Sequence, residues 1–268
     1  MDEKKYEGIL ICSDFDGTLA YQNKISDENC QAIRHFMENG GLFTIVSGRH
    51  PKFFNEYANL FVPNTYICGM NGTIIEAPDS HHRIYDAPMG KDVFLFVRQI
   101  IDEIPEAEMV QFQSAESSIT FKREQGGPIF KTTDISFNEA DIPEYIYKVL
   151  FVVPDDASDA VLKRVSMLCG QKYTVSRSWL NGIEIQRRGE DKGHAVNVLR
   201  KYLAESVHTI IGVGDYENDL PLLREADIAV AVEDAIDEVK GVSDYIVPNC
   251  SKDSLAQVIY EIADKLNK

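Results

Sequence analysis

The chain has 268 residues, with 27 Lys and Arg against 43 Asp and Glu and a formal net charge of −16. So acidic a chain argues against nucleic acid or an anionic membrane surface as its main partner and suits bound cations. No run approaches the roughly 20 apolar residues of a membrane span, and the start Met-Asp-Glu-Lys-Lys-Tyr lacks the apolar segment of a signal peptide. We therefore expect a cytoplasmic protein with one large domain, or a core plus an insertion.

The cysteines point to no disulfide framework and no zinc site. Their number is odd, they are scattered and none forms a C-x-x-C pair. We expect reduced thiols that mostly pack in the core: Cys12, Cys30, Cys68, Cys169 and Cys250.

The first chemical signal lies at the end of the first predicted strand. Residues 9–13 are apolar without alternation, which is typical of a strand buried on both faces, and the chain then turns polar. Ligands of an open parallel sheet bind at the carboxyl ends of its strands, so Asp14 and Asp16 are predicted at the mouth of a site. Two carboxylates this close need a cation or a shared proton.

The next segments predict a parallel sheet. A helical pattern follows Ser26 and ends near Gly40, and a second apolar strand over 42–46 ends at Ser47-Gly48-Arg49. Strand–helix–strand with short connections implies a right-handed unit that brings Ser47 alongside Asp14. We expect a helix after Pro51, a brief strand over 66–68 and a tight hairpin turn at Asn71-Gly72.

From residue 83 to residue 188 the rhythm changes to an α+β pattern, which we interpret as an inserted domain. Helices are expected near 93–101 and 156–169. Strands are expected near 109–113, 118–122, 145–153, 172–176 and 182–187, with a Gly126-Gly127-Pro128 loop between the second and third.

The alternation of strands and helices seen in the first segments returns at residue 189. Lys192-Gly193 opens a helix, and an apolar strand over 207–213 ends in the most acidic cluster, which contains Asp215 and Asp219. Strands over 226–232 and 245–247 and helices over 234–240 and 252–267 complete the pattern. The expected fold is a doubly wound, mostly parallel α/β core over 1–82 and 189–268, with an inserted α+β cap over 83–188.

Each cluster alone has an ordinary explanation. Asp-x-Asp-Gly also suits a plain turn, and Ser47, Asp215 and Asp219 also suit helix N-termini, while a Lys at a helix start is usually solvated. A calcium loop from Asp14 is excluded, because its sixth and twelfth positions are Leu19 and Ile25 instead of Gly and Glu. The joint placement of the clusters, three at strand ends of one sheet, outweighs these explanations.

Together the clusters suit phosphoryl transfer. A carboxylate can attack phosphorus, while strand-end N–H groups and a hydroxyl hold the phosphate oxygens, and Mg²⁺ with Lys192 offsets the negative charge. Four aspartates around one Lys leave an excess of negative charge, which a protonated Asp16 would lower. A neutral Asp16 could give its proton to the leaving alkoxide and later take one from water.

Four motifs in order resemble the haloacid dehalogenase superfamily, in particular its Cof-like branch of sugar-phosphate phosphatases: Asp14-Phe-Asp16-Gly-Thr18, Ser47-Gly48-Arg49, Lys192-Gly193 and Gly214-Asp215-Tyr-Glu-Asn218-Asp219. Asn71-Gly72 also matches this branch, whose cap is inserted between the second and third motifs. One departure is Glu190-Asp191 before Lys192, where the branch often has an uncharged pair.

The resemblance implies a role for each motif residue. Asp14 would be the nucleophile and Asp16 the general acid and base, while Ser47, Gly48 and Lys192 would hold the phosphate. Mg²⁺ would be bound by Asp14, by the backbone carbonyl of Asp16 and by Asp215. Supporting roles would fall to Thr18, Asn71, Asn218 and Asp219. The implied activity is Mg²⁺-dependent hydrolysis of a small phosphorylated metabolite through an aspartyl-phosphate on Asp14.

Two alternatives stay open, a phosphomutase of the same superfamily and a signalling receiver that holds a phosphoryl group on Asp14. The insertion argues against a receiver, which needs no lid. A monomer and a weak dimer both fit the sequence. Six basic residues of the insertion are weighed as anion contacts, although a solvated charge is the commoner state of each: Lys122, Arg123, Lys131, Arg177, Arg187 and Arg188.

Overall fold

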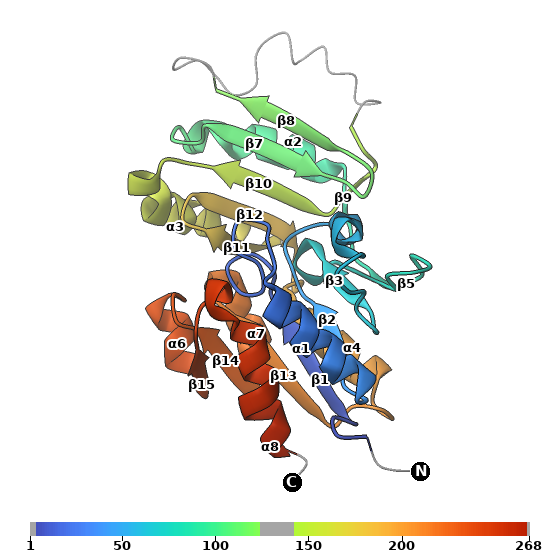
Figure 1. Cartoon of the computed structure of the whole chain (residues 1–268). Helices are drawn as coiled ribbons and strands as arrows, with labels where there is room; N and C mark the ends of the chain where they lie inside the picture. Colours follow the sequence, from blue (N-terminus) through green and yellow to red (C-terminus); the bar gives the residue numbers. More distant parts are fainter. Residues whose placement is uncertain (1–3, 124–141, 267–268) are drawn as a thin grey trace. The chain divides into compact units, whose positions relative to one another are not determined.

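The computed structural model describes residues 4–123 and 142–266 and divides the chain into two compact units (Figure 1). Unit 1 combines Met1–Asp86 with Asp191–Lys268, and unit 2 is Ala87–Glu190. Each unit has its own cluster of buried apolar side chains. None of the helices in the described ranges is long and apolar enough to cross a bilayer.

Unit 1 is built on a five-stranded sheet in the order β15-β14-β13-β1-β2. Every neighbouring pair is parallel, as the strand–helix rhythm predicted. The carboxyl ends of all five strands therefore lie along one edge. The strands are β1 (Ile9–Ser13), β2 (Leu42–Ile45), β13 (Thr209–Gly214), β14 (Ile228–Val232) and β15 (Tyr245–Val247).

Helices connect these strands. The predicted cap of the first helix is present, because the Ser26 side chain accepts a hydrogen bond from the Asn29 N–H. The helix expected after Pro51 is a 3₁₀ helix, η1 (Pro51–Tyr57), and helix α5 was not expected. The helices are α1 (Asp27–Glu38), α4 (Lys192–Tyr202), α5 (Leu220–Glu225) and α6 (Asp237–Val242).

The C-terminal segment differs from the single helix expected over 252–267. Asp253 takes a left-handed conformation, with φ of 64°, and this breaks the segment. The pieces are η8 (Cys250–Lys252), α7 (Ser254–Gln257), a π-helical turn η9 (Val258–Ala263) and α8 (Asp264–Leu266). Only Lys252 of the expected helix precedes Asp253, so helical structure covers nearly all of the predicted range, with a π-helical turn in its middle.

The hairpin predicted at Asn71-Gly72 is present between β3 (Ile67–Gly69) and β4 (Ile74–Glu76), and β5 (Arg83–Asp86) pairs with β4. The connection is a short 3₁₀ turn, η2 (Met70–Gly72), instead of a two-residue turn. Gly72 has φ of +95°, and a Cβ there would lie 2.7 Å from the Ala195 Cβ, so glycine is required.

Unit 2 is an antiparallel sheet in the order β11-β12-β10-β7-β8, with a two-stranded β6-β9 pair, in agreement with the expected α+β pattern. The strand expected over 145–153 is split in two. The predicted Gly126–Pro128 loop and Lys131 lie outside the described residues. The elements are β6 (Met89–Gly90), α2 (Asp92–Ile100), η3 (Ile101–Glu103), β7 (Met109–Gln113), β8 (Ser118–Lys122), β9 (Tyr145–Ile146), β10 (Lys148–Val152), η6 (Asp155–Ala157), α3 (Ser158–Cys169), β11 (Tyr173–Trp179) and β12 (Gly182–Arg187).

The two faces of the unit 2 sheet differ in chemistry. One face is apolar and joins the buried side chains of α2 and α3 in one core, with Phe112 and Phe151 among its largest residues. Most of the alternate positions are polar, and on them the Lys148 Nζ and the Glu184 Oε1 form a buried ion pair at 2.6 Å. The Ser178 hydroxyl donates to the other Glu184 oxygen at 2.5 Å.

All five cysteines are buried and free, which confirms that they are core thiols.

Candidate active site

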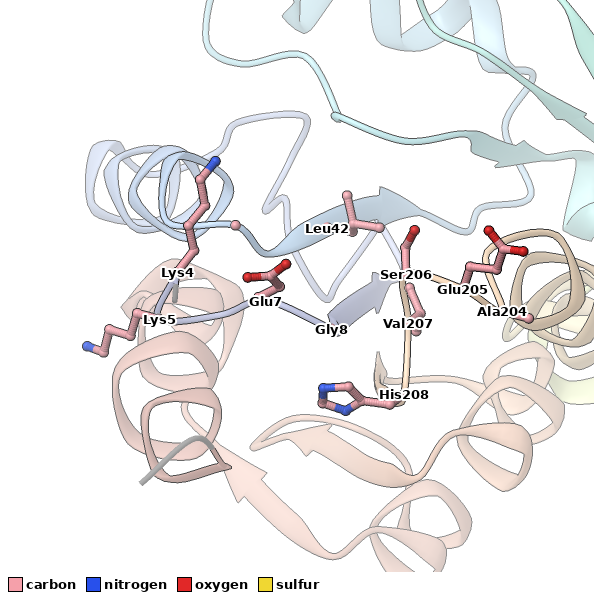
Figure 2. Close-up of a pocket in the computed structure, with 11 residues that line it drawn as sticks. Lys4, Lys5, Glu7, Gly8, Leu42, Ala204, Glu205, Ser206, Val207 and His208 are labelled. Atoms are coloured by element: carbon pink, nitrogen blue, oxygen red, sulfur yellow. The ribbon is translucent and has the colours of Figure 1, made fainter. Parts of the chain in front are cut away.

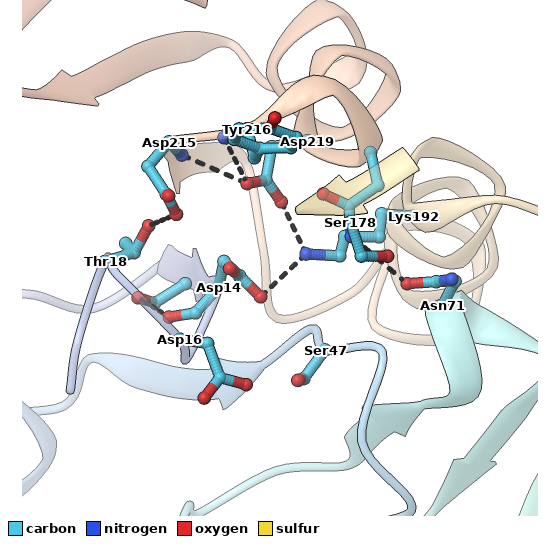
Figure 3. Close-up of polar contacts among 12 residues, drawn as sticks. Asp14, Asp16, Thr18, Ser47, Asn71, Ser178, Lys192, Asp215, Tyr216 and Asp219 are labelled. Carbon is cyan, nitrogen blue, oxygen red and sulfur yellow. Dashed lines mark hydrogen bonds and ion pairs between the residues drawn. The ribbon is translucent and has the colours of Figure 1, made fainter. Parts of the chain in front are cut away.

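Three strand ends of unit 1 bring the predicted residues together. The Asp14 N–H donates to the Val213 carbonyl at 2.9 Å and the Val46 N–H donates to the Ser13 carbonyl at 2.8 Å, so the parallel ladder continues to the last residue of each strand. Asp14, Ser47 and Asp215 therefore follow β1, β2 and β13 at the same edge. Figure 3 shows their side chains gathered around the Lys192 amino group.

Lys192 lies between two carboxylates. Its Nζ donates to Asp14 Oδ1 and to Asp219 Oδ1, each at 2.6 Å (Figure 3), and its side chain is 1% exposed. Lys192 is the first residue of α4, and the Asp191 side chain caps that helix by accepting from the His194 N–H at 2.7 Å. The acidic residue before Lys192, a departure from the family pattern, is thus a helix cap in this chain.

Glycine at position 193 lets α4 approach its neighbour. A Cβ on Gly193 would lie 2.6 Å from the Pro221 carbonyl oxygen on α5, closer than real Cβ contacts allow. The α4–α5 packing that places Lys192 beside Asp219 therefore depends on this glycine. This is the structural reason for the Lys-Gly pair.

The carboxyl groups around Lys192 can carry more negative charge than this one ammonium group balances. Burial raises the pKa of Asp14 well above its ordinary value, and the charge of Asp219 raises it further, against the lowering effect of Lys192. Desolvation, with repulsion from Asp219, raises the pKa of Asp215 to about 7. Burial acts to lower the pKa of Lys192, but attraction to Asp14 and Asp219 outweighs it and raises that pKa. One ammonium group thus faces three crowded carboxyls.

Asp215 is held from two sides. The Thr18 hydroxyl donates to Asp215 Oδ1 at 2.6 Å, and a Cβ on Gly17 would lie 2.6 Å from Asp215 Oδ2. Gly17 also has φ of +82°, a conformation that suits glycine. The loop after β1 therefore forms a close-fitting cradle for this carboxylate.

The donor set fits a hard divalent cation. Carboxylate oxygens of Asp14, Asp215 and Asp219 lie within 4.8 Å of one another, and ligands of an octahedral Mg²⁺ are about 2.9 to 4.1 Å apart. Both Asp219 oxygens are already occupied, one by Lys192 and the other by the backbone N–H groups of Asp215 and Tyr216. Asp14 and Asp215 are therefore better placed than Asp219 to bind a cation through their side chains.

Asp16 lies apart from this cluster, and its carboxylate points away from Lys192 (Figure 3). It accepts from Arg49 Nη2 at 2.7 Å and from Arg49 Nε at 2.9 Å, and its side chain is 48% exposed. The Arg49 guanidinium also stacks over the Phe53 ring at 4.3 Å. The carboxylate that the sequence argument assigned to proton transfer is therefore bound by both prongs of an arginine.

Arg49 is the residue that sequence reasoning missed. It stands in the Ser47-Gly48-Arg49 motif but received no role, because its partner is 33 positions away and on another loop. The Lys148–Glu184 pair of unit 2 was missed too, although a lysine at the start of the apolar strand β10 was a signal.

The remaining motif residues surround the cluster. Ser47 is 1% exposed, and its hydroxyl oxygen accepts from the Arg49 N–H at 3.2 Å, so its own proton is available to an acceptor. The Asn71 N–H donates to the Ser47 carbonyl at 2.9 Å, and the Asn218 side chain donates to the Asn71 side chain at 3.4 Å. Gly48 follows Ser47 directly. Asn71 thus links the second and fourth motifs.

The basic residues weighed as anion contacts in the insertion differ in their surroundings. Arg177 is 9% exposed and donates to Asp159 at 2.7 Å, so its guanidinium already has a carboxylate partner. Arg123 and Arg188 donate to backbone carbonyls. Among the described members, Lys122 and Arg187 have exposed side chains and no such contact within residues 4–123 and 142–266.

A cavity of about 620 Å³ lies at the amino ends of the strands, the opposite edge from Asp14 (Figure 2). Lys4, Lys5 and His208 line it, but Figure 2 shows the two lysine side chains pointing in different directions. Lys5 is paired with Asp264 at 2.7 Å. These groups do not converge on one point, so the cavity presents no ligand site.

The sequence pattern of the haloacid dehalogenase-like hydrolases matches residues 11–259. The chain belongs to this family. This match confirms the fold class and the hydrolase activity that the motifs predicted. The predictions of the Cof-like branch and of a phosphatase agree with the relatives. A haloacid dehalogenase-like hydrolase from Bacillus subtilis has a similar structure, with a TM-score of 0.79 and 20% identity over 94% of this chain and 99% of that one.

Two of the relatives by sequence have phosphatase names. The phosphoglycolate phosphatase 2 of Saccharolobus solfataricus is 28% identical over 96% of this chain and 92% of its own length. The 5-amino-6-(5-phospho-D-ribitylamino)uracil phosphatase YitU of Bacillus subtilis is 26% identical over 97% and 98%. A chloroplastic protein of Arabidopsis thaliana named endoribonuclease YBEY is 24% identical over 98% of this chain, which spans only 49% of that protein.

Proposed function

We propose that this hydrolase is a Mg²⁺-dependent phosphatase of small phosphate monoesters that forms an aspartyl-phosphate on Asp14. The observation that carries the proposal is the Asp14 carboxylate at the end of β1, fixed by Lys192 at 2.6 Å and grouped with Asp215 and Asp219. A positioned carboxylate beside a cation and a metal-binding acidic pair is what covalent phosphoryl transfer requires.

The phosphate group is held by donors at the second and third motifs. The Ser47 hydroxyl and the Gly48 N–H would donate to its oxygens, and the Lys192 ammonium would stabilise the charge that develops on them. Asn218, whose side chain donates to Asn71, would add a further donor. Bound Mg²⁺ supplies further charge neutralisation of phosphate and carboxylate oxygens, and Asp14, Asp215 and the Asp16 carbonyl would hold it.

The first chemical step joins an Asp14 carboxylate oxygen to phosphorus and breaks the bond between phosphorus and the ester oxygen. The ester oxygen leaves as an alkoxide and takes the proton of Asp16. This role requires Asp16 to carry a proton before the step and to leave Arg49, which binds its carboxylate in the observed structure.

In the second step a water oxygen attacks phosphorus and the bond to Asp14 breaks. Asp16, now ionised, takes a proton from that water, so that inorganic phosphate leaves and the starting protonation states return. Lys192 keeps the Asp14 carboxylate in place through both steps. This division of labour gives Asp14 the covalent role and Asp16 the proton transfers.

We propose that the catalytic core predicted over 1–82 and 189–268 corresponds to unit 1, and that the cap predicted over 83–188 corresponds to unit 2, Ala87–Glu190, and selects the leaving group. The separate core of unit 2 supports an independent domain there. The named substrates of the two phosphatase relatives, both small phosphate monoesters, support the same substrate class.

The test is release of inorganic phosphate from p-nitrophenyl phosphate and from a panel of sugar and sugar-alcohol phosphates, with Mg²⁺ present. The Asp14→Asn variant is the matched control, because it keeps the size of the side chain and removes the nucleophile. Turnover of wild type no higher than that of Asp14→Asn on every ester would contradict the proposal. Isomerised phosphate ester in place of free phosphate would identify a phosphomutase.

A further inference from the structure

The C-terminal helix α7 contacts the catalytic loop at one buried point. The Ser254 hydroxyl, on the first residue of α7, donates to the Thr18 carbonyl at 2.8 Å, and both residues are fully buried. Ser254 is 236 positions from Thr18 and lies outside the four motifs. This hydrogen bond connects helix α7 to the loop that follows β1.

Thr18 also contacts the acidic cluster through its side chain. Its hydroxyl donates to Asp215 Oδ1 at 2.6 Å, while Gly17 lies against Asp215 Oδ2. The bond from Thr18 occupies one Asp215 oxygen and leaves the other for a cation. The orientation of the Asp215 carboxylate therefore depends on where the Thr18 backbone is held.

Helix α7 is itself fixed independently of the loop. The Ala256 N–H donates to the buried Asn29 side chain at 2.9 Å, which attaches α7 to α1. The left-handed Asp253 starts the helix at Ser254. Ser254 is thus presented from a rigid support, and a hydroxyl donor presented in this way can set the position of the Thr18 carbonyl.

We propose that Ser254 is a positioning residue for the metal-binding carboxylate of Asp215 and acts through Thr18. The inference rests on the proposed function, because it presumes a cation at Asp14 and Asp215. Removing the Ser254 hydroxyl leaves a buried carbonyl without its donor, so the loop shifts and Asp215 loses its fixed orientation. Outer groups that orient metal ligands typically change metal affinity by tenfold or more.

The experiment measures Mn²⁺ binding directly, by the paramagnetic signal of free Mn²⁺, for wild type, Ser254→Ala and Ser243→Ala. Ser243 is the control, because its hydroxyl also donates to a backbone carbonyl, that of Val239 at 2.8 Å, and this bond involves neither Thr18 nor the Asp215 carboxylate. We expect the dissociation constant to rise about 10-fold in Ser254→Ala and to stay at the wild-type value in Ser243→Ala.

Thermal unfolding of the metal-free variants separates positioning from a merely structural role. A lower melting temperature of Ser254→Ala with an unchanged Mn²⁺ dissociation constant overturns the inference. If Ser254→Ala does not fold, Ser254→Cys decides, because its thiol fills the same space and is a weaker donor. Wild-type affinity for Mn²⁺ in that variant also overturns the inference.

Failure of wild type to bind Mn²⁺, or binding that Asp215→Asn leaves intact, contradicts the metal site of the proposed function and the inference with it.

Discussion

The Arg49 guanidinium holds the Asp16 carboxylate by two hydrogen bonds, Nε to Oδ2 at 2.9 Å and Nη2 to Oδ1 at 2.7 Å. The guanidinium is held in turn by the Phe53 ring and by the Asn23 side chain, which accepts from Nη2 at 3.3 Å. The side chain to which we assign proton transfer therefore lies outside the cluster around Lys192. The proposed role would require this pair to open.

Asp16→Asn should bind substrate like wild type but lower kcat about 10²- to 10⁴-fold, the usual contribution of a general acid and base. The amide can still accept from Arg49, so the loop should keep its position. With p-nitrophenyl phosphate, whose leaving group needs no proton, the first step survives and hydrolysis of the phosphoenzyme becomes slow.

The measurement for Asp16→Asn is a stopped-flow trace of nitrophenolate release. A rapid burst close to the enzyme concentration, followed by slow turnover, is expected. Asp14→Asn is the control and should show no burst. Wild-type turnover by Asp16→Asn would show that this residue does not transfer the proton.

Metal affinity should rise with pH through about 7. Desolvation raises the pKa of Asp215 from 3.8 to about 7, and the pKa of Asp14 is raised in the same direction. Below pH 7 protons therefore compete with the cation for the carboxylates, and above pH 7 the deprotonated carboxylates can bind the cation. Mn²⁺ titrations between pH 5.5 and 8.5 check this, and a dissociation constant independent of pH in that range would refute it.

The same pKa values predict how the metal-free protein responds to pH. A carboxyl whose folded pKa is raised stabilises the fold fully below its unfolded pKa, near 4, and loses that contribution as pH rises through the folded value. For Asp215 the loss falls between about pH 4 and pH 7. Added Mg²⁺ should therefore raise the melting temperature more at pH 8 than at pH 5.5.

Lys192→Met should destabilise the metal-free protein by about 3–5 kcal/mol, because it leaves Asp14 and Asp219 buried without their shared cation. Methionine fills a similar volume, so the loss reports charge more than packing. Urea unfolding in EDTA measures it, and saturating Mg²⁺ should recover part of the loss. A stability equal to wild type at pH 8 would mean that the three groups do not interact as their 2.6 Å contacts indicate.

The sequence by itself determined that the core sheet is parallel and where the strand ends that carry Asp14, Ser47 and Asp215 lie. These follow from local patterns, because an apolar run that stops at polar residues marks a strand end wherever it occurs, and short strand–helix–strand connections have a fixed hand. The runs of predicted strands over residues 83–188 also indicated the α+β pattern of the inserted segment.

Only the tertiary structure decided which side chains meet across these elements. The Asp16–Arg49 pair, the place of Lys192 between Asp14 and Asp219, and the Ser254–Thr18 bond each join segments 27 to 236 positions apart. Such contacts depend on helix packing and loop conformation, including the left-handed Asp253 after which α7 begins. Asp14 and Asp16 looked alike in the sequence, but packing buries Asp14 beside Lys192 and turns Asp16 outward to Arg49.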